Sequence, residues 1–183
     1  NLGGQTVNYE IPAGYVTAED PMYDVILGIM QKAMPQGLRI KAMYVQTAND
    51  VNFRTSNGES GLDNYLIITV LDQLANTTVS TKDFKDFKRE LKENNGLLDE
   101  AQDMVSEKLD DVLRGQIQMG NMQSLGCFGE TDTELSYVML MDQQANINGK
   151  QIAIRQALVF TGVLVDGKLI FVNQYRIVDN ESE

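Results

Sequence analysis

The sequence contains no histidine, and Cys127 is its single cysteine. Histidine and cysteine are the side chains that most often act as nucleophiles, general acids or bases, and transition-metal ligands. Their scarcity removes most enzyme classes that depend on them. An intrachain disulfide is also impossible. We expect Cys127, in a strand between Gly126 and Phe128, to be a small apolar residue of the core rather than a reactive thiol.

Basic charge and long apolar runs are equally scarce. The 183 residues carry a net charge of −11, which disfavours nucleic acids and anionic lipid surfaces as partners. The longest mainly apolar stretch, residues 158–165, is interrupted by Thr161 and Gly162 and is far shorter than the roughly 20 residues that span a bilayer. We therefore expect no nucleic-acid partner and no membrane insertion by this segment.

Common catalytic motifs are missing as well. The chain has no GxGxxG after a strand, no phosphate-binding GxxxxGK[ST], no GxSxG and no CxxC. No spacing of acidic residues pairs two of them for acid/base work. We expect a protein that is not an enzyme, while carboxylate chemistry, which needs no histidine, remains an alternative.

The first third of the chain predicts a short helix and strands around it. Residues 7–11 alternate like a strand, and Asp20 followed by Pro21 is the pattern of an N-cap and first helical residue. Apolar residues then recur at helical spacing until Pro35. Residues 38–45 alternate, which places Leu38, Ile40, Ala42 and Tyr44 on one face of a strand. Residues 49–64 are mostly polar and predict a long loop, and residues 65–71 a buried central strand.

The middle of the chain carries the strongest helical signal. Ser80 and Asp83 form the pattern of a capping box. Apolar residues spaced three, four or seven positions apart form one stripe along the expected helix. The stripe consists of Phe84, Phe87, Leu91, Leu98, Ala101, Val105, Leu109 and Val112. Residues 94–96 interrupt it, so the pattern fits either one kinked helix or two helices.

The last third predicts strands in series. Residues 124–128, 135–143, 151–165 and 168–177 are apolar or alternating, and Asn148-Gly149 and Asp166-Gly167 are strong hairpin signals. We therefore predict one domain, residues 1–183, of the α+β class. An antiparallel β-sheet with a C-terminal meander would be covered by a long amphipathic helix and a shorter N-terminal helix, similar to an α/β/α sandwich.

Short motifs along most of the chain resemble the PsbP-like superfamily. Residues 9–15 read Tyr-Glu-Ile-Pro-Ala-Gly-Tyr, similar to the opening strand and Ile-Pro-x-Gly-aromatic turn of many PsbP-like domains. Later come Leu125-Gly126-x-Phe128 and the Gly-Lys-Leu-Ile-Phe of residues 167–171. The resemblance implies an antiparallel sheet sandwiched by helices, although this chain ends near Ile177 without the family's common C-terminal helix.

The resemblance implies a non-enzymatic binding role but transfers no functional residue. Family members range from photosystem-associated lumenal proteins to a nuclear release factor for the GTPase Ran, so the fold does not determine the function. Together with a start at Asn1 that lacks an initiator methionine, the resemblance leads us to expect an extracytoplasmic or cell-envelope location. The expected partner is another protein, and an exposed aromatic patch near Phe53 is the candidate contact.

Metal binding is the alternative function. Thioethers bind Cu(I), and the candidate ligands are Met119, Met122, Met139 and Met141, of which the last two would point to the same side of a strand. Ca²⁺ prefers carboxylate oxygens. Asp99, Asp103, Glu107 and Asp110 share one face of the expected long helix. Without histidine or a second cysteine, methionine is more often a flexible gap-filler, and a rigid acidic helix face is more often solvated surface. We expect no other cofactor.

Overall fold

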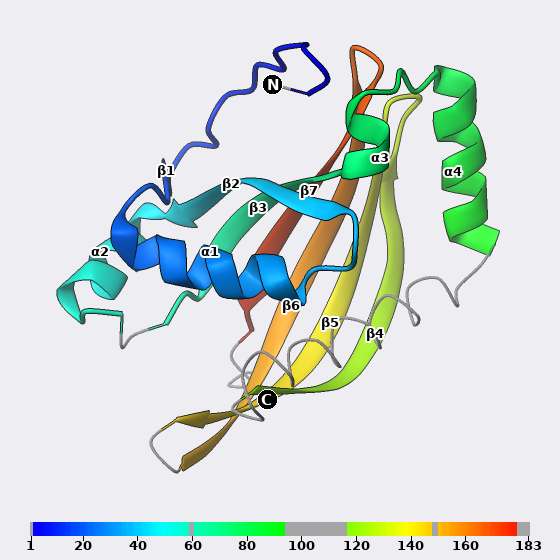
Figure 1. Ribbon diagram of the computed structural model, residues 1–183. Coiled ribbons are helices and arrows are strands. Elements are labelled where there is room, and N and C mark those ends of the chain that lie inside the picture. The colour runs from blue at the N-terminus through cyan, green and yellow to red at the C-terminus, as the bar shows by residue number, and fades with distance from the viewer. Residues whose placement is uncertain (1, 59–60, 94–116, 148–149, 179–183) are drawn as a thin grey trace.

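A computed structural model describes residues 2–58, 61–93, 117–147 and 150–178. Seven strands form one antiparallel sheet in the order β1-β2-β3-β7-β6-β5-β4 (Figure 1). The strands are β1 (Tyr15–Thr17), β2 (Leu38–Gln46), β3 (Asn64–Leu71), β4 (Ile117–Glu130), β5 (Glu134–Ile147), β6 (Lys150–Val165) and β7 (Lys168–Ile177). The helices are α1 (Pro21–Ala33), α2 (Thr47–Thr55), α3 (Asp72–Ala75) and α4 (Thr81–Glu93).

The predicted C-terminal meander is confirmed. Strands β4, β5, β6 and β7 are neighbours in chain order and pair antiparallel. Asp166 and Gly167 both have positive φ, 48° and 73°, as the two central residues of a tight hairpin require. Ile147 pairs with Lys150 across the β5–β6 connection. The Asn148-Gly149 dipeptide itself lies outside the described residues.

The helices that the structure describes pack on one face of the sheet. Helices α1 and α2 bury Tyr23 and Phe53 against Met43, Val45 and Ile67 of β2 and β3. Helix α3 lies farther along, beside β3 and β7, and α4 covers the same face over β5, β6 and β7 (Figure 1). The sheet-plus-helix class is therefore confirmed. Helices on both faces, as in the expected sandwich, are not seen in the described ranges.

The opposite face is covered in part by the N-terminal segment. Leu2 and Val7 pack against Tyr44, Leu66 and Ile68 on this side. Residues 7–11 form no strand, so that prediction is wrong; the first regular strand is β1. Of the apolar residues in this segment, Val7 packs on the sheet, whereas Tyr9 and Ile11 are 52% and 47% exposed.

Local capping signals correctly predict where two helices begin. Asp20 caps α1 through a 3.0 Å bond from the Met22 backbone N–H, and Pro21 is the first helical residue. The Ser80 N–H donates to the Asp83 carboxylate at 3.0 Å, and the Asp83 N–H donates to the Ser80 hydroxyl at 3.2 Å. These reciprocal bonds form the expected capping box of α4.

Two elements differ from the prediction. A β-bulge between Ile40 and Ala42 shifts the register of β2 against β3. Ile40 and Met43 consequently face α1, whereas Ala42 and Tyr44 face the N-terminal segment, so the predicted single face is wrong. Helix α2 spans Thr47–Thr55, so the first part of the expected loop of residues 49–64 is helical. This helix has little apolar periodicity, and Phe53 is the residue it buries.

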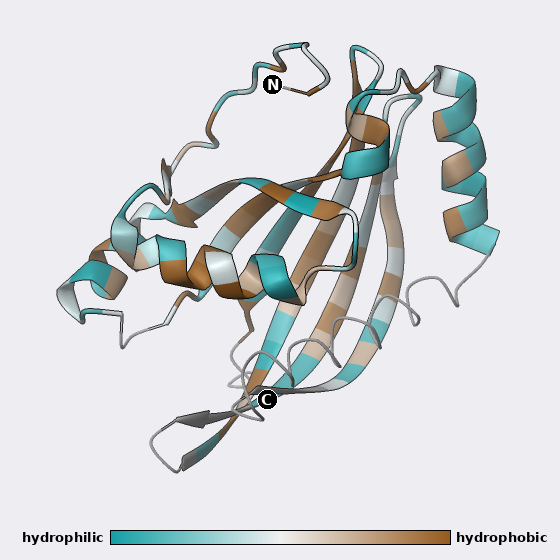
Figure 2. Ribbon diagram, in the orientation of Figure 1, coloured by the Kyte–Doolittle hydropathy of each residue, from teal (hydrophilic) through white to brown (hydrophobic). Residues whose placement is uncertain are grey.

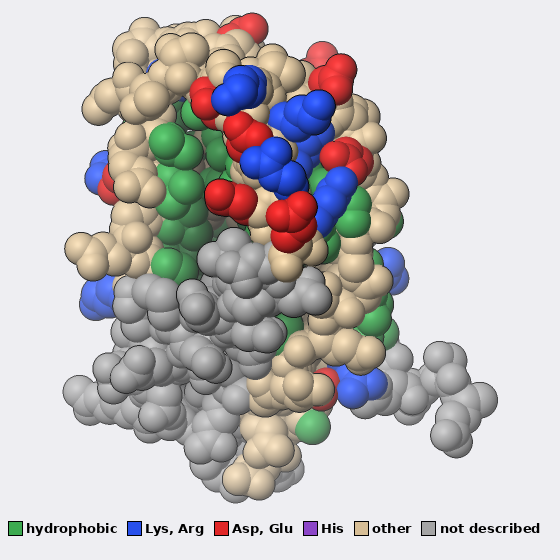
Figure 3. Space-filling view, turned by 90° about the vertical axis from the view of Figure 1, so that its right-hand side faces the viewer, with side chains coloured by type: hydrophobic (Ala, Val, Ile, Leu, Met, Phe, Trp, Pro, Cys, Tyr) green, Lys and Arg blue, Asp and Glu red, His purple; other side chains and the backbone are tan. Residues whose placement is uncertain are grey.

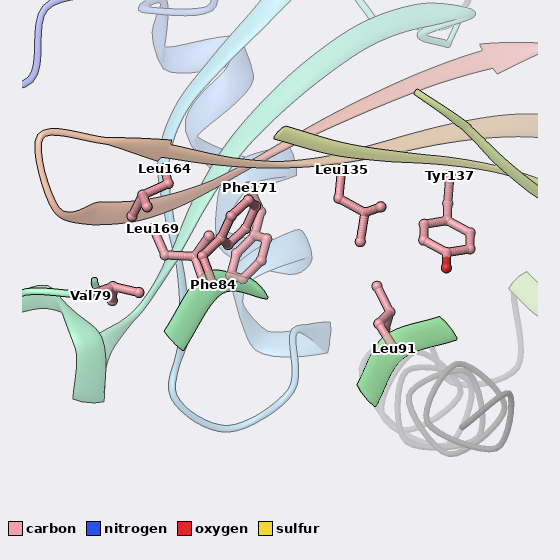
Figure 4. Packing of buried hydrophobic residues seen from close by; sticks show 8 residues of the cluster. All are labelled: Val79, Phe84, Leu91, Leu135, Tyr137, Leu164, Leu169 and Phe171. Carbon is pink, nitrogen blue, oxygen red and sulfur yellow. The ribbon is translucent and has the colours of Figure 1, made fainter. Parts of the chain in front are cut away.

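Helix α4 lies over the meander with an apolar side inward. Figure 2 shows its apolar residues on the side toward the strands, and Figure 3 shows basic and acidic side chains interleaved on its exposed side. Phe84 is fully buried, next to Phe171 in the cluster of Figure 4. The long covering helix predicted for this stripe is seen as far as Glu93, and residues 94–112 lie outside the described ranges.

Candidate functional site

A groove of about 490 Å³ lies at the β1–β2 edge of the sheet, beside α1. Ligand clefts in proteins usually enclose about 300–1,000 Å³. We call it the edge groove, and its walls come from α1, from β2 and from the segment on either side of β1. Its lining residues are Tyr9, Thr17, Ala18, Glu19, Leu27, Gly28, Gln31, Ile40, Lys41, Ala42, Met43 and Tyr44.

The groove exists because β1 is much shorter than β2. Strand β1 pairs with residues 44–46, and the Ala18 N–H adds one more bond, 3.0 Å long, to the Met43 carbonyl. The chain then turns away at Asp20 to begin α1. In the described part of the chain, no strand lies beside the outer edge of residues 38–42. An exposed sheet edge offers backbone donors and acceptors to any extended segment.

The side-chain amide of Gln31 occupies part of this open edge. Its Nε2 donates to the Leu38 carbonyl at 2.9 Å, and its Oε1 accepts from the Ile40 N–H at 2.8 Å. One amide group thus makes the donor and acceptor contacts that a neighbouring strand would make with residues two positions apart. Gln31 therefore acts as a local cover for the edge of β2.

Polar and aromatic groups line the other wall of the groove. The buried Tyr44 hydroxyl donates to the Tyr9 hydroxyl at 2.5 Å, and the two rings meet edge to face. Burial raises the pKa of Tyr44, and the Tyr9 bond and the Glu19 charge add to this. Tyr9 is 52% exposed, and Glu19 and Lys41 are exposed too. The groove thus offers an aromatic ring, hydroxyls and one charge of each sign.

Gly28 leaves one wall of the groove open. It lies inside α1, where glycine costs about 0.5–1 kcal/mol relative to alanine. A Cβ at this position would meet no other atom within 4 Å, so close packing does not explain the glycine. Its location is notable because a side chain here would project into the space beside the sheet edge.

We predict that Gly28→Ala raises the free energy of unfolding by about 1 kcal/mol, because the helix gains propensity and the methyl group has room. The melting temperature should rise by about 2–4 °C for a chain of this size. Urea and thermal unfolding of both proteins measure the change. Gly14→Ala is the contrasting variant, since Gly14 has a φ of 83° and should be destabilised. A loss of stability in Gly28→Ala would show that the position is constrained.

Helix α1, one wall of the groove, is fixed to α2 by a polar network. The Tyr23 hydroxyl donates to Asp50 at 2.7 Å, and Arg54 donates to both Asp50 and Asp20. The Met22 N–H and then Arg54 hold the pKa of Asp20 below its usual range. The network connects the N-cap of α1 to the last turn of α2.

We predict that Asp20→Asn lowers stability at neutral pH and less so in acid. Asparagine can still cap α1, but it lacks the charge that attracts Arg54. Because the folded-state pKa of Asp20 is lowered, its charge stabilises the protein above the unfolded pKa of about 3.9. This contribution is lost as the pH falls through the folded pKa. Urea unfolding from about pH 7 to pH 2 should show the two proteins converging in acid. A constant difference would contradict this.

The structure brings three of the four candidate methionines together. Met122 is paired in register with Met141, and Met139 and Met141 are buried on the same face of β5. All three belong to one cluster with Leu158. Met119 is paired with Gln143 in the backbone register, and its side chain lies outside the described residues. The pairing of β4 with β5 therefore brings Met122 next to Met139 and Met141.

The candidate calcium ligands lie outside the described residues, at positions 99, 103, 107 and 110. Within the ranges that the structure describes, no three acidic or cysteine side chains gather as a metal site. The acids with lowered pKa values each have a structural partner. The Asp142 carboxylate pairs with Arg155, and Glu130 pairs with Lys92 and Lys88. Their lowered pKa values follow from these hydrogen bonds and ion pairs.

Two residues lie in surroundings opposite to those expected. Phe53 is 4% exposed and stacks on Tyr23 at 5.0 Å, so the prediction of an exposed ring there is wrong; the ring is needed to seat α2. Cys127 is exposed rather than in the core. It lies on the edge strand β4 beside register shifts, where Leu125 and Phe128 are exposed too. Bulges at an edge turn such side chains away from the core.

The sequence interpretation missed the edge groove, although two signals were present. Gly28 and Gln31 interrupt the apolar pattern of α1 on one side of the helix, three residues apart. A comparison of the chain with protein-family models, curated proteins and solved structures found no significant match. In the described ranges, no helix combines the length and apolarity that crossing a bilayer demands.

Proposed function

We propose that this chain is a non-enzymatic binding domain that engages a protein partner through the edge groove. The observation that carries the proposal is the open edge of β2 at residues 38–42, bordered by the gap at Gly28. Backbone groups, the Tyr9 ring and the single carboxylate of Glu19 suit recognition of a polypeptide. Acid/base chemistry by paired carboxylates would need a second acid in this lining.

Selection from a phage-displayed library of random dodecapeptides tests the proposal. Enriched peptides should bind the purified protein with a Kd in the micromolar range and bind Gly28→Leu at least tenfold more weakly, because the leucine side chain would occupy part of the groove. Val25→Leu is the matched control, since Val25 is 67% exposed and is not among the residues that line the groove. Failure to enrich peptides, or equal binding to Gly28→Leu, would refute the groove as a binding site.

The methionine cluster supports a second candidate function, Cu(I) binding. Met122, Met139 and Met141 present three thioethers within one cluster of the helix-covered face. Competition with a chromophoric Cu(I) chelator under reducing conditions should show one equivalent bound. Met139→Leu combined with Met141→Leu should abolish uptake at little cost in packing, whereas Met43→Leu, in a different cluster, should not. No uptake by the unaltered protein would remove this candidate.

A further inference from the structure

We propose that the edge groove takes an extended, positively charged segment of the partner, which adds to the sheet as a strand beside β2 and replaces the amide of Gln31. This inference rests on the proposed function and specifies its ligand. A strand already lies along this edge of β2, because β1 pairs with residues 44–46. The chain turns away from the edge after Ala18, and the edge groove lies along the part of the edge beyond that point.

The contacts of Gln31 show which backbone groups of β2 lie on its open edge. The Leu38 carbonyl and the Ile40 N–H both point away from β3 and toward α1, since the Gln31 amide reaches both. A peptide backbone carries the same donor and acceptor as a side-chain amide. An incoming strand can therefore exchange with Gln31 bond for bond, and no buried polar group of β2 loses its partner.

Gly28 provides the room for this exchange. It lies three residues before Gln31, on the same side of α1. Its missing Cβ leaves open space opposite β2, and Ala42 narrows the groove little from the other side. Residues 38–42 span about 13 Å of strand, so the open edge suits a segment of about four residues. Such short strand additions obtain affinity from main-chain bonds and specificity from alternate side chains.

Charge favours a basic segment. The protein has a net charge of −11, and Glu19 is exposed at the end of the groove where β1 stops. Asp24 is exposed one helical turn before Gly28. Lys41 is the one basic side chain in the lining, so an acidic residue of the bound segment would be favoured only next to Lys41. The overall field raises the local concentration of cationic segments and makes their association sensitive to salt.

N-methylation of the backbone tests strand addition directly. The probes are the dodecapeptides selected on the unaltered protein, resynthesised with single N-methyl groups at successive positions. Methylation removes a donor without changing side chains, so alternate positions over three or four residues should weaken binding at least tenfold and the intervening positions less than threefold. Uniform insensitivity, with binding still blocked by Gly28→Leu, would overturn strand addition and leave the proposed function intact.

Gln31 provides the second measurement. Gln31→Met keeps the volume of the side chain but cannot bond to β2, so the peptides no longer compete with an internal partner and should bind about threefold to tenfold more tightly. Val25→Leu again serves as the control, with unchanged affinity. In hydrogen exchange, the Ile40 amide of the unaltered protein should slow at least tenfold on binding. Weaker binding by Gln31→Met would instead assign its amide to direct contact with the peptide and refute the exchange.

The selected sequences test the charge. Lysine and arginine should exceed aspartate and glutamate at least twofold among the enriched peptides, and Glu19→Lys should weaken their binding about tenfold at low salt and less at high salt. Lys41→Glu should leave affinity equal or higher. Enrichment of acidic peptides would overturn the assignment of a basic ligand. A purely apolar consensus, insensitive to salt, would do so too.

Discussion

Tyr23→Ala should lower the free energy of unfolding by about 3–5 kcal/mol. The ring is fully buried, stacks on Phe53 at 5.0 Å and lies under the Arg54 guanidinium at 5.5 Å. Alanine would leave a cavity where α1, α2 and β2 meet, because each of these elements contributes to the cluster. Urea unfolding monitored by circular dichroism measures the loss.

Two variants separate the contributions of Tyr23. Tyr23→Phe keeps the ring and removes the bond to the Asp50 carboxylate, so it should cost about 1.5–3 kcal/mol, as expected for a hydrogen bond to a charged group. Tyr9→Ala is the control, because Tyr9 is half exposed and should cost less than Tyr23→Ala by a wide margin. Equal losses in Tyr23→Ala and Tyr9→Ala would refute the central position of Tyr23.

Tyr23 also connects the core to the candidate site. It lies on the side of α1 that faces the core, whereas Gly28 and Gln31 lie on the side that faces the groove. The position of α1 as a wall of the groove therefore depends on the packing of Tyr23 in the core. Tyr23→Phe, which should remain folded, is expected to weaken peptide binding modestly by loosening this wall.

Features that depend on neighbours in sequence could be predicted from the sequence. The caps of α1 and α4 were predicted because Asp20 and Ser80 bond within three residues along the chain. The meander was predicted because each hairpin joins adjacent strands, and Asp166-Gly167 adopts the positive φ that such a turn needs. Local chemistry determines these features, whatever the rest of the fold does.

Features that depend on distant pairing could not be predicted in this way. The bulge in β2 follows from its register against β3, more than twenty residues away, and it reverses the faces of Ala42 and Tyr44. Helix α2 has an apolar residue to bury, Phe53, but its sequence lacks a helical stripe. Tertiary contacts with Tyr23 stabilise it, and propensity alone does not.

The candidate site belongs to this second group. An edge groove exists only because β1 ends after Thr17 while β2 continues past it, and neither length is encoded locally. The pattern of β5 predicted that Met139 and Met141 share a face. Their contact with Met122 required the register between β4 and β5. Sequence alone therefore supplied candidate residues, and pairing decided which of them meet.

Phe84→Ala should have an equally large effect, a loss of about 3–5 kcal/mol in the free energy of unfolding. Phe84 is fully buried, stacks on Phe87 at 6.0 Å and has the Lys88 ammonium 5.3 Å from its ring centre. The exposed ion pairs of α4, such as that of Lys82 with Asp86, contribute at most about 1 kcal/mol each. The apolar contacts of Phe84 therefore contribute more to the attachment of α4 than an exposed ion pair does.

Phe84→Leu should cost less, about 1–2 kcal/mol, because leucine fills part of the space. Lys82→Ala is the control on the exposed side of α4, with a change within about 0.5 kcal/mol. Neither the Phe84 variants nor the control should alter peptide affinity per folded molecule, because α4 covers the meander while the edge groove lies at the β1 end of the sheet. A loss of binding in folded Phe84→Leu would mean that the two ends of the sheet are coupled, and the independence of the groove from α4 would be refuted.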